Sequence, residues 1–321
     1  MLYLDEKDIK EMAIDWDRTI SVIEETVKCL YWNETAQPIK PYLRYKEPQN
    51  RIIAMPAYVG GKVDKAGIKW IASFPDNIHK NIPRAHSITI LNDADTGVPI
   101  CITNTAMLSI IRTASVSGLI IKHYKKYRDI KDTTVGIIGW GPIGQHHLDM
   151  CMNLLGDSIS KIYIYDLKGI DNINLPAKYM KKVVVTDSWQ EVYLNSNIFI
   201  TCTASKDRYI DIKPNEGCLL LNVSLRDYKK EVFPYVKDSI IVDNWEEVCR
   251  ENTDIEMFHK ECGMNQNSSI SIEEIVCEER MKSFSRRSTI MFNPMGMATF
   301  DIAIASYYYD LAYENKIGLL L

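Results

Sequence analysis

The stretch that most constrains the fold is Thr133–Gly144, TTVGIIGWGPIG, in which an apolar run leads directly into three spaced glycines. The run Val135–Ile138 predicts a parallel strand that is covered on both faces. Gly139, Gly141 and Gly144 follow the pattern GxGxxG. This pattern allows a tight turn, close approach of a phosphate to the backbone, and packing of the next helix on the strand. The stretch therefore predicts the start of a dinucleotide-binding domain.

The segment after the first glycines has the features of a helix N-terminus that faces a phosphate. Pro142 suits the first helical position, because its missing N–H would be unpaired there in any case. The N–H groups that follow, beginning at Ile143, lie at the positive end of the helix dipole and attract an anion. We expect cofactor contacts at Gly139, Gly141, Pro142, Ile143 and Gly144.

A second predicted strand supplies the acidic residue of the same fingerprint. Lys161–Tyr165 ends in Asp166, about 20 residues beyond the glycines, where the fingerprint places an acidic side chain. A carboxylate there accepts hydrogen bonds from the adenine ribose and repels a 2′-phosphate, so we predict NAD in preference to NADP. The alternative is that the glycines form a packing turn and that Asp166 only ends a strand.

The composition limits the class of protein. The chain has 321 residues, enough for two domains, and its net charge of −4 gives no sign of a surface for nucleic acid or anionic membranes. The first residues, MLYLDEKDIKE, are acidic, and no apolar stretch of 18 residues occurs, so we expect a cytoplasmic protein without membrane spans. The eight cysteines contain no C-x-x-C pair, and the adjacent His146 and His147 have no partner at ligand spacing. We therefore expect reduced thiols and no metal.

The remaining pattern divides the chain into an N-terminal half rich in hairpins and a region of alternating strands and helices. Helical periodicity within residues 5–32 predicts one or two amphipathic helices, and Asn104–Lys122 predicts a long connecting helix. We also expect helices over Trp245–Lys260 and Met297–Glu314, whereas Leu167–Lys181 is poorly helical. Short apolar runs predict strands at residues 51–58, 66–72, 86–92, 99–103, 161–165, 182–186, 197–203, 217–223, 239–243 and 289–292.

Several motifs, taken in order along the chain, resemble one protein family. PYLR, IAMP, GIKW, LNDxxTGxP, IRTAS, GxGxxG and NPMGMA resemble the ornithine cyclodeaminase/mu-crystallin family across nearly the whole chain. QPIKPYLR, RIIAMP and NPMGMA resemble most closely its siderophore-pathway branch, the N-(2-amino-2-carboxyethyl)-L-glutamate dehydrogenases. The resemblance implies an α/β fold in which a doubly wound, Rossmann-type NAD-binding domain (residues 116–293) is inserted between two pieces (1–115 and 294–321) of a second α/β domain. That second domain is expected to bind a small amino-acid-derived substrate and to form a homodimer.

The resemblance also implies a cationic site for the α-carboxylate of the substrate. The family's Arg, Lys and second Arg match Arg44, Lys69 and Arg112, and Met295 matches a further substrate contact. The chemistry agrees, because a guanidinium offers a rigid fork to a carboxylate and an ammonium adds a compact charge. Lys69 lies in an apolar setting, IKWI, where an unpaired ammonium is costly. The alternative for each basic residue is a solvated surface charge.

The catalytic carboxylate of the family matches Asp227, which follows a predicted strand. Residues beyond the carboxyl ends of parallel strands face the cofactor crevice. We expect Asp227 to be the general base and Lys69 to be the next candidate for proton transfer, although Asp227 as a turn-capping residue is the alternative. The resemblance implies further cofactor contacts at Thr113, Thr203, Asn222, Val223, Ser224, Lys230 and Asn293.

One departure from the family separates the candidate reactions. Cyclodeaminases carry Glu where this chain has Ile53, within RIIAMP, and an isoleucine cannot exchange protons. The resemblance therefore favours NAD-dependent oxidation and hydrolysis of N-(2-amino-2-carboxyethyl)-L-glutamate to L-2,3-diaminopropionate and 2-oxoglutarate. The alternatives are an ornithine cyclodeaminase, which forms proline and ammonia, and a non-catalytic nucleotide-binding protein like mu-crystallin.

Overall fold

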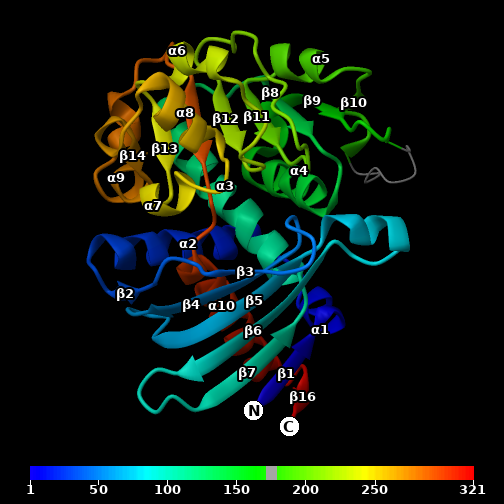
Figure 1. The fold of residues 1–321 in the computed structure, drawn as a ribbon, viewed down its shortest axis with the longest axis vertical. Helices are drawn as coiled ribbons and strands as arrows, with labels where there is room; N and C mark the ends of the chain where they lie inside the picture. The colour runs from blue at the N-terminus through cyan, green and yellow to red at the C-terminus, as the bar shows by residue number, and fades with distance from the viewer. Residues whose placement is uncertain (171–178) are drawn as a thin grey trace. The chain divides into compact units, whose positions relative to one another are not determined.

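The computed structural model describes residues 1–170 and 179–321 (Figure 1). The chain forms two compact units, one made of Met1–Ser115 with Gly296–Leu321 and the other of Val116–Met295. The boundary after Ser115 falls inside helix α3 (Met107–Tyr127), so one continuous helix contributes to both units. The first unit is thus assembled from the two ends of the chain.

The first unit is built on a mixed sheet of eight strands with the order β16-β1-β7-β6-β5-β4-β2, in which β3 also pairs with β4. β1 and β7 run parallel, and the other neighbours are antiparallel. The strands are β1 (Leu2–Asp5), β2 (Thr35–Ala36), β3 (Tyr42–Arg44), β4 (Arg51–Val59), β5 (Lys65–Ser73), β6 (Ala85–Asp93), β7 (Pro99–Asn104) and β16 (Leu319–Leu320).

Two helices cover one face of this sheet. α10 (Ala298–Asn315) packs on β4, β5 and β6, and α2 (Trp16–Tyr31) packs on α10. Strand residues alternate between the covered face and the opposite face, as the strand period of two requires. Along β5, for example, the buried Lys69 is followed by the exposed Trp70. Lys69, which lies between apolar residues in the sequence, therefore points toward the covered face.

The second unit is built on a sheet in which all eight strands run parallel, with the order β10-β9-β8-β11-β12-β15-β13-β14. The strand order reverses between β8 and β11, and ligands bind at the carboxyl ends of the strands on either side of such a reversal. This confirms the predicted doubly wound α/β sheet. The strands are β8 (Thr133–Ile138), β9 (Ile159–Tyr165), β10 (Val183–Val185), β11 (Ile198–Thr201), β12 (Leu219–Asn222), β13 (Ile240–Val242), β14 (Ile270–Ser271) and β15 (Ile290–Asn293).

The other helices connect these strands. Several begin at a side-chain cap, for example Ser188 before α5 and Ser271 before α9, which satisfies amide groups that lack a helical partner. They are α1 (Glu6–Glu11), α4 (Pro142–Leu155), α5 (Trp189–Leu194), α6 (Phe233–Val236), α7 (Trp245–Val248), α8 (Asp254–Cys262), α9 (Ile272–Cys277) and the 3-10 turns η1 (Pro75–Lys80), η2 (Gly156–Ser158), η5 (Lys230–Val232), η6 (Gln266–Ser268) and η7 (Arg280–Ser283).

The predicted strands are confirmed, each within two residues of its expected ends, but one predicted helix is wrong. The continuous helix expected over Trp245–Lys260 is two helices, α7 and α8, separated by a turn in which Glu251 and Asn252 have φ values of 62° and 57°. Thr253 then caps α8 through a hydrogen bond from the N–H of Glu256. Most of Leu167–Lys181 lies outside the described residues.

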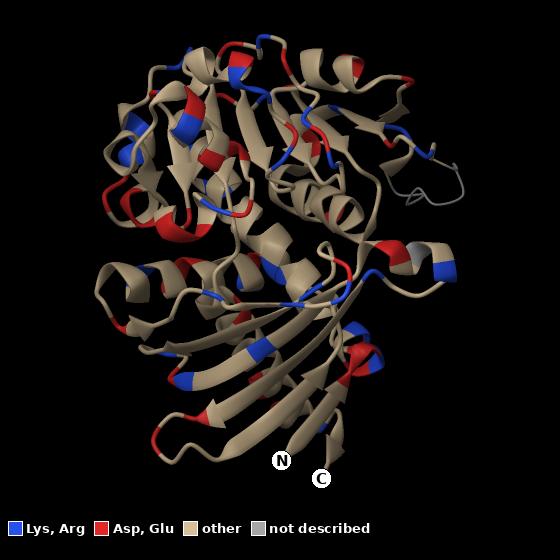
Figure 2. Cartoon of the chain, in the orientation of Figure 1, with Lys and Arg blue, Asp and Glu red and all other residues tan. Residues whose placement is uncertain are grey.

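Charged residues of both signs are interspersed along the helices and loops, whereas the strands of the second unit contain almost none (Figure 2). This distribution agrees with a parallel sheet that is buried on both faces. Within the described part of the chain, no helix has the length and apolar character that crossing a membrane requires.

Candidate active site

The glycine-rich turn lies at the carboxyl end of β8 in the second unit. Gly139 has a φ of 93°, and a Cβ added there would lie 2.5 Å from the carbonyl oxygen of Cys202. A Cβ added at Gly144 would lie 2.1 Å from the carbonyl oxygen of Gly139. At Gly141 a Cβ would meet no atom of the described residues within 4 Å. Packing therefore requires the first and third glycines, while the second keeps open space in front of α4.

The N-terminus of α4 faces that open space with free amide groups. Gly141 is the N-cap, and no described side chain caps the helix. The first intrahelical hydrogen bond is donated by Gln145 to the carbonyl of Gly141 at 3.1 Å, so the N–H groups of Ile143 and Gly144 precede it. Unpaired amides at the positive end of a 14-residue helix form an anion site. The turn thus fits the pyrophosphate of a dinucleotide.

Asp166 lies at the carboxyl end of β9 and holds the glycine turn in place. Its Oδ2 accepts a hydrogen bond from the backbone N–H of Trp140 at 2.7 Å, and its Oδ1 accepts one from Lys168 at 2.9 Å. The carboxylate keeps further lone pairs, since each oxygen accepts one of these bonds. Asp166, for which the sequence predicts a contact with the ribose, stabilises the glycine-rich loop in this structure, a role that the sequence did not indicate.

The buried carboxylate of Asp227 lies in the loop after β12 and is fully protected from solvent. Thr203 donates its hydroxyl to Oδ1 at 2.5 Å, and Ser224 donates to Oδ2. Tyr209 lies beside it, and the pKa of this phenol is raised by burial and by the charge of Asp227. Thr203 and Ser224, predicted as cofactor contacts, are therefore hydrogen-bond donors that orient the carboxylate.

Two predicted cofactor contacts, Asn222 and Asn293, are buried at the ends of neighbouring strands. Asn222 donates from Nδ2 to Oδ1 of Asn293 at 2.8 Å and to Oδ2 of Asp254 at 3.0 Å. The backbone N–H of Val223 turns back to the carbonyl of Leu221 at 3.1 Å. These hydrogen bonds stabilise the loop that carries Asp227. Asp254 belongs to the same network and was not predicted from the sequence.

Three other predicted residues have local partners. Thr113 donates its hydroxyl to the carbonyl of Ser109 one turn earlier in α3, at 2.7 Å. The exposed ammonium of Lys230 lies 3.1 Å from the carboxylate of Glu261. The backbone N–H of Met295 donates to Asp243 at 3.0 Å. Thr113 belongs to the first unit, and Lys230 and Met295 belong to the second.

The first unit contains a buried cluster of charges on the helix-covered face of its sheet. Lys69 from β5 places Nζ 2.8 Å from Oδ2 of Asp301, and Arg112 from α3 donates from Nε to Oδ1 of the same carboxylate at 2.9 Å. The side chains of Lys69 and Asp301 are each only 3% exposed. The sequence predicted the two cations, and the structure brings them together through an aspartate of α10.

The charges in this cluster shift one another's proton affinity. Burial lowers the pKa of Lys69 to about 8. The positive charges of Arg112 and Lys40 lower this pKa further, whereas the negative charge of Asp301 raises it. Burial alone would raise the pKa of Asp301, but the charges of Arg112 and Lys69 outweigh it, so that pKa lies below its ordinary value. Asp301 is therefore ionised at neutral pH, and Lys69 is mostly protonated.

Lys40 and Gly296 complete the cluster. The buried Lys40 donates from Nζ to the carbonyl oxygen of Gly296 at 2.7 Å. Gly296 has a φ of 86°, and a Cβ added there would lie 2.5 Å from Nη1 of Arg112, so the guanidinium packs directly on the glycine backbone. Lys40 and Asp301 were missed. Their sequence signals are a lysine between prolines in QPIKP and a lone acidic residue in the apolar run ATFDIAIA.

Arg44, the third predicted ligand of the carboxylate, lies on the exposed edge strand β3. Its Nη1 donates to the carbonyl of Pro48 at 3.0 Å, and its guanidinium lies 5.4 Å from the ring centroid of Tyr42. In the strand register Arg44 is opposite Arg51, whereas Lys69 is opposite Met55, four residues further along β4. The structure therefore does not join Arg44 to the buried cluster.

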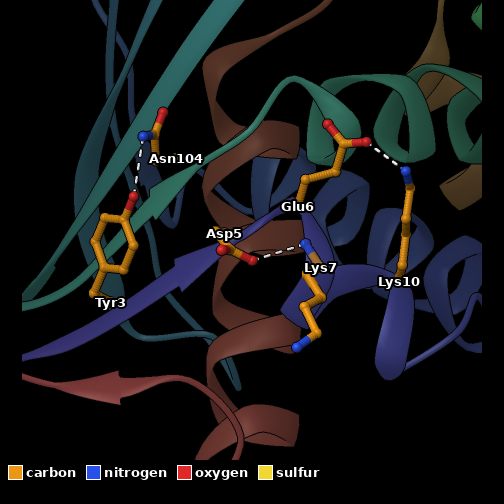
Figure 3. A pocket seen from close by; sticks show the side chains of 6 residues that line it. All are labelled: Tyr3, Asp5, Glu6, Lys7, Lys10 and Asn104. Atoms are coloured by element: carbon orange, nitrogen blue, oxygen red, sulfur yellow. Dashed lines mark hydrogen bonds and ion pairs between the residues drawn. The ribbon is translucent and has the colours of Figure 1, made fainter.

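Other features of the described residues offer less chemistry. A surface hollow of about 680 Å³ is lined by exposed or half-buried side chains (Figure 3). In it Lys10 pairs with Glu6, and Asp5 accepts the N–H of Lys7, so these charges are engaged within α1 itself. His147 of α4 is buried against Ser117, and burial lowers its pKa to about 4. All eight cysteines are free thiols.

Comparison with known proteins identifies relatives along the full length of the chain. The N-((2S)-2-amino-2-carboxyethyl)-L-glutamate dehydrogenase of Staphylococcus aureus is 32% identical over 335 aligned residues, which cover 100% of this chain and 98% of the relative. Among solved structures, the Δ1-pyrroline-2-carboxylate reductase of Thermococcus litoralis, in complex with NADH and L-proline, has a TM-score of 0.87 at 24% identity and covers 100% of both chains. An archaeal alanine dehydrogenase, a dimer with bound NAD, has a TM-score of 0.82 at 20% identity and covers 99% of this chain and 98% of its own.

These structures share the two-unit α/β fold, with a parallel nucleotide-binding sheet and a mixed sheet formed from both ends of the chain. The model of the ornithine cyclodeaminase/mu-crystallin family matches residues 5–316. The chain therefore belongs to the ornithine cyclodeaminase/mu-crystallin family.

Proposed function

We propose that this protein is an NAD-dependent oxidoreductase that cleaves a carbon–nitrogen bond of N-((2S)-2-amino-2-carboxyethyl)-L-glutamate, forming L-2,3-diaminopropionate and 2-oxoglutarate. The observation that carries the proposal is the buried cluster of Lys69, Arg112 and Asp301, a preformed site for a carboxylate in a chain that also has a dinucleotide fold. The full-length identity of 32% to the Staphylococcus aureus dehydrogenase supports the choice of substrate. The diamine product would feed siderophore or related biosynthesis.

The residues of the second unit suit NAD. The amides of Ile143 and Gly144 would hold the pyrophosphate, with the space in front of Gly141 left open for it. Asp166 would accept hydrogen bonds from the ribose hydroxyls, and its charge disfavours the 2′-phosphate of NADP. When bound, NAD supplies the acceptor for the hydride from the glutamate Cα. The chain's own residues have the tasks of binding, orientation and proton transfer.

The cluster in the first unit would bind the α-carboxylate of the glutamate portion. Lys69 and Arg112 provide two cations against the single carboxylate of Asp301, so these three residues retain an excess of positive charge. Because Asp301 uses Nε of Arg112, the two terminal nitrogens remain as a planar pair of donors, the geometry that a carboxylate accepts.

Asp227 would act as the general base. Loss of the Cα hydride and of the amine proton, which passes to Oδ of Asp227, converts the secondary amine into an imine. Water then adds to the imine carbon, and cleavage of the C–N bond releases the keto acid and the primary amine. Hydrogen bonds from Thr203 and Ser224 fix the direction of the carboxylate.

Ile53 argues against the cyclising alternative. It lies in β4 opposite Ile71 of β5, at the place where cyclodeaminases carry a glutamate, and it can neither accept nor donate a proton. Ring closure by a side-chain amine requires such a group to deprotonate that amine, whereas hydrolysis of the imine by water does not.

The test of the proposal is a substrate panel with purified protein and NAD, followed by NADH fluorescence and by analysis of the products. N-((2S)-2-amino-2-carboxyethyl)-L-glutamate should yield one NADH and one 2-oxoglutarate for each molecule consumed. L-ornithine and L-alanine are the comparison substrates. Proline and ammonia from ornithine, without net NADH, would contradict the proposal and indicate a cyclodeaminase, and NADH from alanine alone would indicate a different dehydrogenase.

Replacement of the proposed base tests the proton-transfer step. Asp227→Asn keeps the size of the side chain but cannot accept a proton at neutral pH. The variant should bind NAD with unchanged affinity, while kcat falls by about 10²–10⁴, the usual contribution of a positioned base. Unchanged kcat would remove Asp227 from the chemistry and make Lys69 the next residue to examine.

The pKa of Lys69 predicts a pH dependence of substrate capture. Because that pKa is about 8, the free enzyme loses the ammonium charge as the pH rises through 8, and kcat/KM should fall there as the α-carboxylate loses its partner. Lys69→Met should have a low kcat/KM without this decline. Lys65→Met, on the same strand, is the matched control and should keep it. A decline near pH 8 that persists in Lys69→Met would assign it to another group.

We also propose that the protein is a homodimer formed through the face of the first unit's sheet that is opposite α10. This face carries an apolar groove lined by Pro41, Tyr42, Leu43, Ile52, Ala54 and Trp70. Trp70 is 42% exposed, and a contiguous exposed apolar surface marks an interaction site. Trp70→Glu should convert a dimer into monomers in sedimentation-velocity runs, whereas Lys62→Glu, an exposed change outside the groove, should not. Monomers for the unmodified protein would contradict the proposal.

A further inference from the structure

The buried carboxylate of Asp254 has no role in the proposed reaction, yet it is one of the most heavily hydrogen-bonded groups in the second unit. It is the first residue of α8 and is fully protected from solvent. Its Oδ2 accepts from the backbone N–H groups of Asp227 and Tyr228, both at 3.1 Å, and from Nδ2 of Asn222 at 3.0 Å. One oxygen thus binds two consecutive amides at the base of the proposed catalytic residue.

The other oxygen of this carboxylate is fixed by a guanidinium. Arg208 donates from Nε to Oδ1 of Asp254 at 2.6 Å. Its Nη2 donates to the carbonyl oxygens of Asn252 and Thr253 at 2.7 and 2.9 Å, so one planar group ties the turn before α8 to the carboxylate. In return the backbone N–H of Asp254 donates to the carbonyl of Leu225 at 2.8 Å.

The backbone of Asp227 is consequently held on both sides. Its N–H is bound by Asp254, and its carbonyl accepts from the N–H groups of Tyr209 and Ile210 at 2.9 and 2.8 Å. With the peptide fixed, the hydroxyls of Thr203 and Ser224 direct the side chain. A shift of the loop would turn the carboxylate away from these donors.

Keeping this charge buried is unfavourable for stability at neutral pH. Burial raises the pKa of Asp254 to about 7, despite the hydrogen bond from Tyr228 and the charge of Arg208. A pKa above the unfolded value of about 4 means that the folded state binds the proton more tightly, so stability falls as the pH rises from about 4 to about 7.

We propose that Asp254 is a positioning residue: through its hydrogen bonds to the amides of Asp227 and Tyr228, it holds the Asp227 carboxylate in the orientation that proton transfer requires. The proposal rests on the catalytic role proposed above for Asp227. It predicts that Asp254 acts on turnover and not on the capture of NAD or substrate.

The test compares Asp254→Asn, Asp227→Asn and the double variant of the full-length protein, with N-((2S)-2-amino-2-carboxyethyl)-L-glutamate and NAD as the probes. Asp254→Asn keeps the side-chain volume but removes the charge that both oxygens share. We expect kcat to fall about tenfold to a hundredfold, with KM and the Kd for NAD within about twofold. Because both residues act through one group, the double variant should be no slower than Asp227→Asn by more than about twofold.

Glu256→Gln is the matched control. It lies on the same helix, and its partners are the N–H of Asn252 and the ammonium of Lys260, so kcat should be unchanged. If Asp254→Asn does not fold, Arg208→Lys serves in its place, since it retains the charge but loses the bond from Nε. It should lower kcat about threefold to tenfold with KM unchanged.

Full kcat in the Asp254→Asn variant, or in Arg208→Lys where that variant is needed, would overturn the positioning role if Asp227→Asn is slow. The positioning role would also be overturned if the decreases in kcat of the two single variants multiplied in the double variant. Independent decreases of this kind would mean that Asp254 does not act through Asp227. Full activity of Asp227→Asn would instead overturn the proposed base itself. The two failures are therefore distinguishable within one set of proteins.

Discussion

The carboxylate of Asp301 is the interaction on which the first unit depends. It is buried between Lys69 and Arg112, and removing one member of such a buried charge cluster typically costs about 3–5 kcal/mol. The three residues come from β5, α3 and α10, so this single contact joins the sheet, the helix that leads into the second unit, and the C-terminal helix. It is one of the contacts between the C-terminal helix and the N-terminal part of the chain, beside the packing of α10 on β4, β5 and β6 and the pairing of β16 with β1.

The second unit also has a carboxylate that pairs with a cation, beyond the carboxyl ends of its strands. There Asp254 and Arg208 form a buried ion pair, and the amides bound by Asp254 belong to the loop that carries Asp227. In the first unit, Asp301 holds the cations to which we expect the substrate to bind. In the second unit, Asp254 holds the loop of Asp227, the residue that we expect to act as the base. Buried charges of this kind add little to net stability, and their contribution here is to geometry.

The sequence predicted the features that depend on local pattern. Seven of the eight strands of the second sheet and the glycine turn follow from apolar runs and residue spacing, whereas β14 was not predicted. Lys69 and Arg112 were implied by the family resemblance. Partners supplied by distant segments were not predicted, because Asp301 and Asp254 acquire their neighbours only when strands and helices assemble. The helix expected over Trp245–Lys260 failed for a local reason: helical periodicity continues across the turn, although Glu251 and Asn252 adopt left-handed backbone angles there.

The proposed function requires Arg112 to bind the α-carboxylate of the glutamate portion of the substrate. The most direct test is a double-mutant cycle in kcat/KM, which combines Arg112→Lys with a substrate whose glutamate α-carboxylate is replaced by a carboxamide. We predict that replacing the carboxylate by the carboxamide lowers kcat/KM in both proteins. The factor of decrease should be at least about tenfold larger for the unmodified enzyme than for the variant, which corresponds to an interaction energy of about 1.4 kcal/mol. Equal losses in the two proteins would contradict the account, because they would show that Arg112 and the α-carboxylate do not interact.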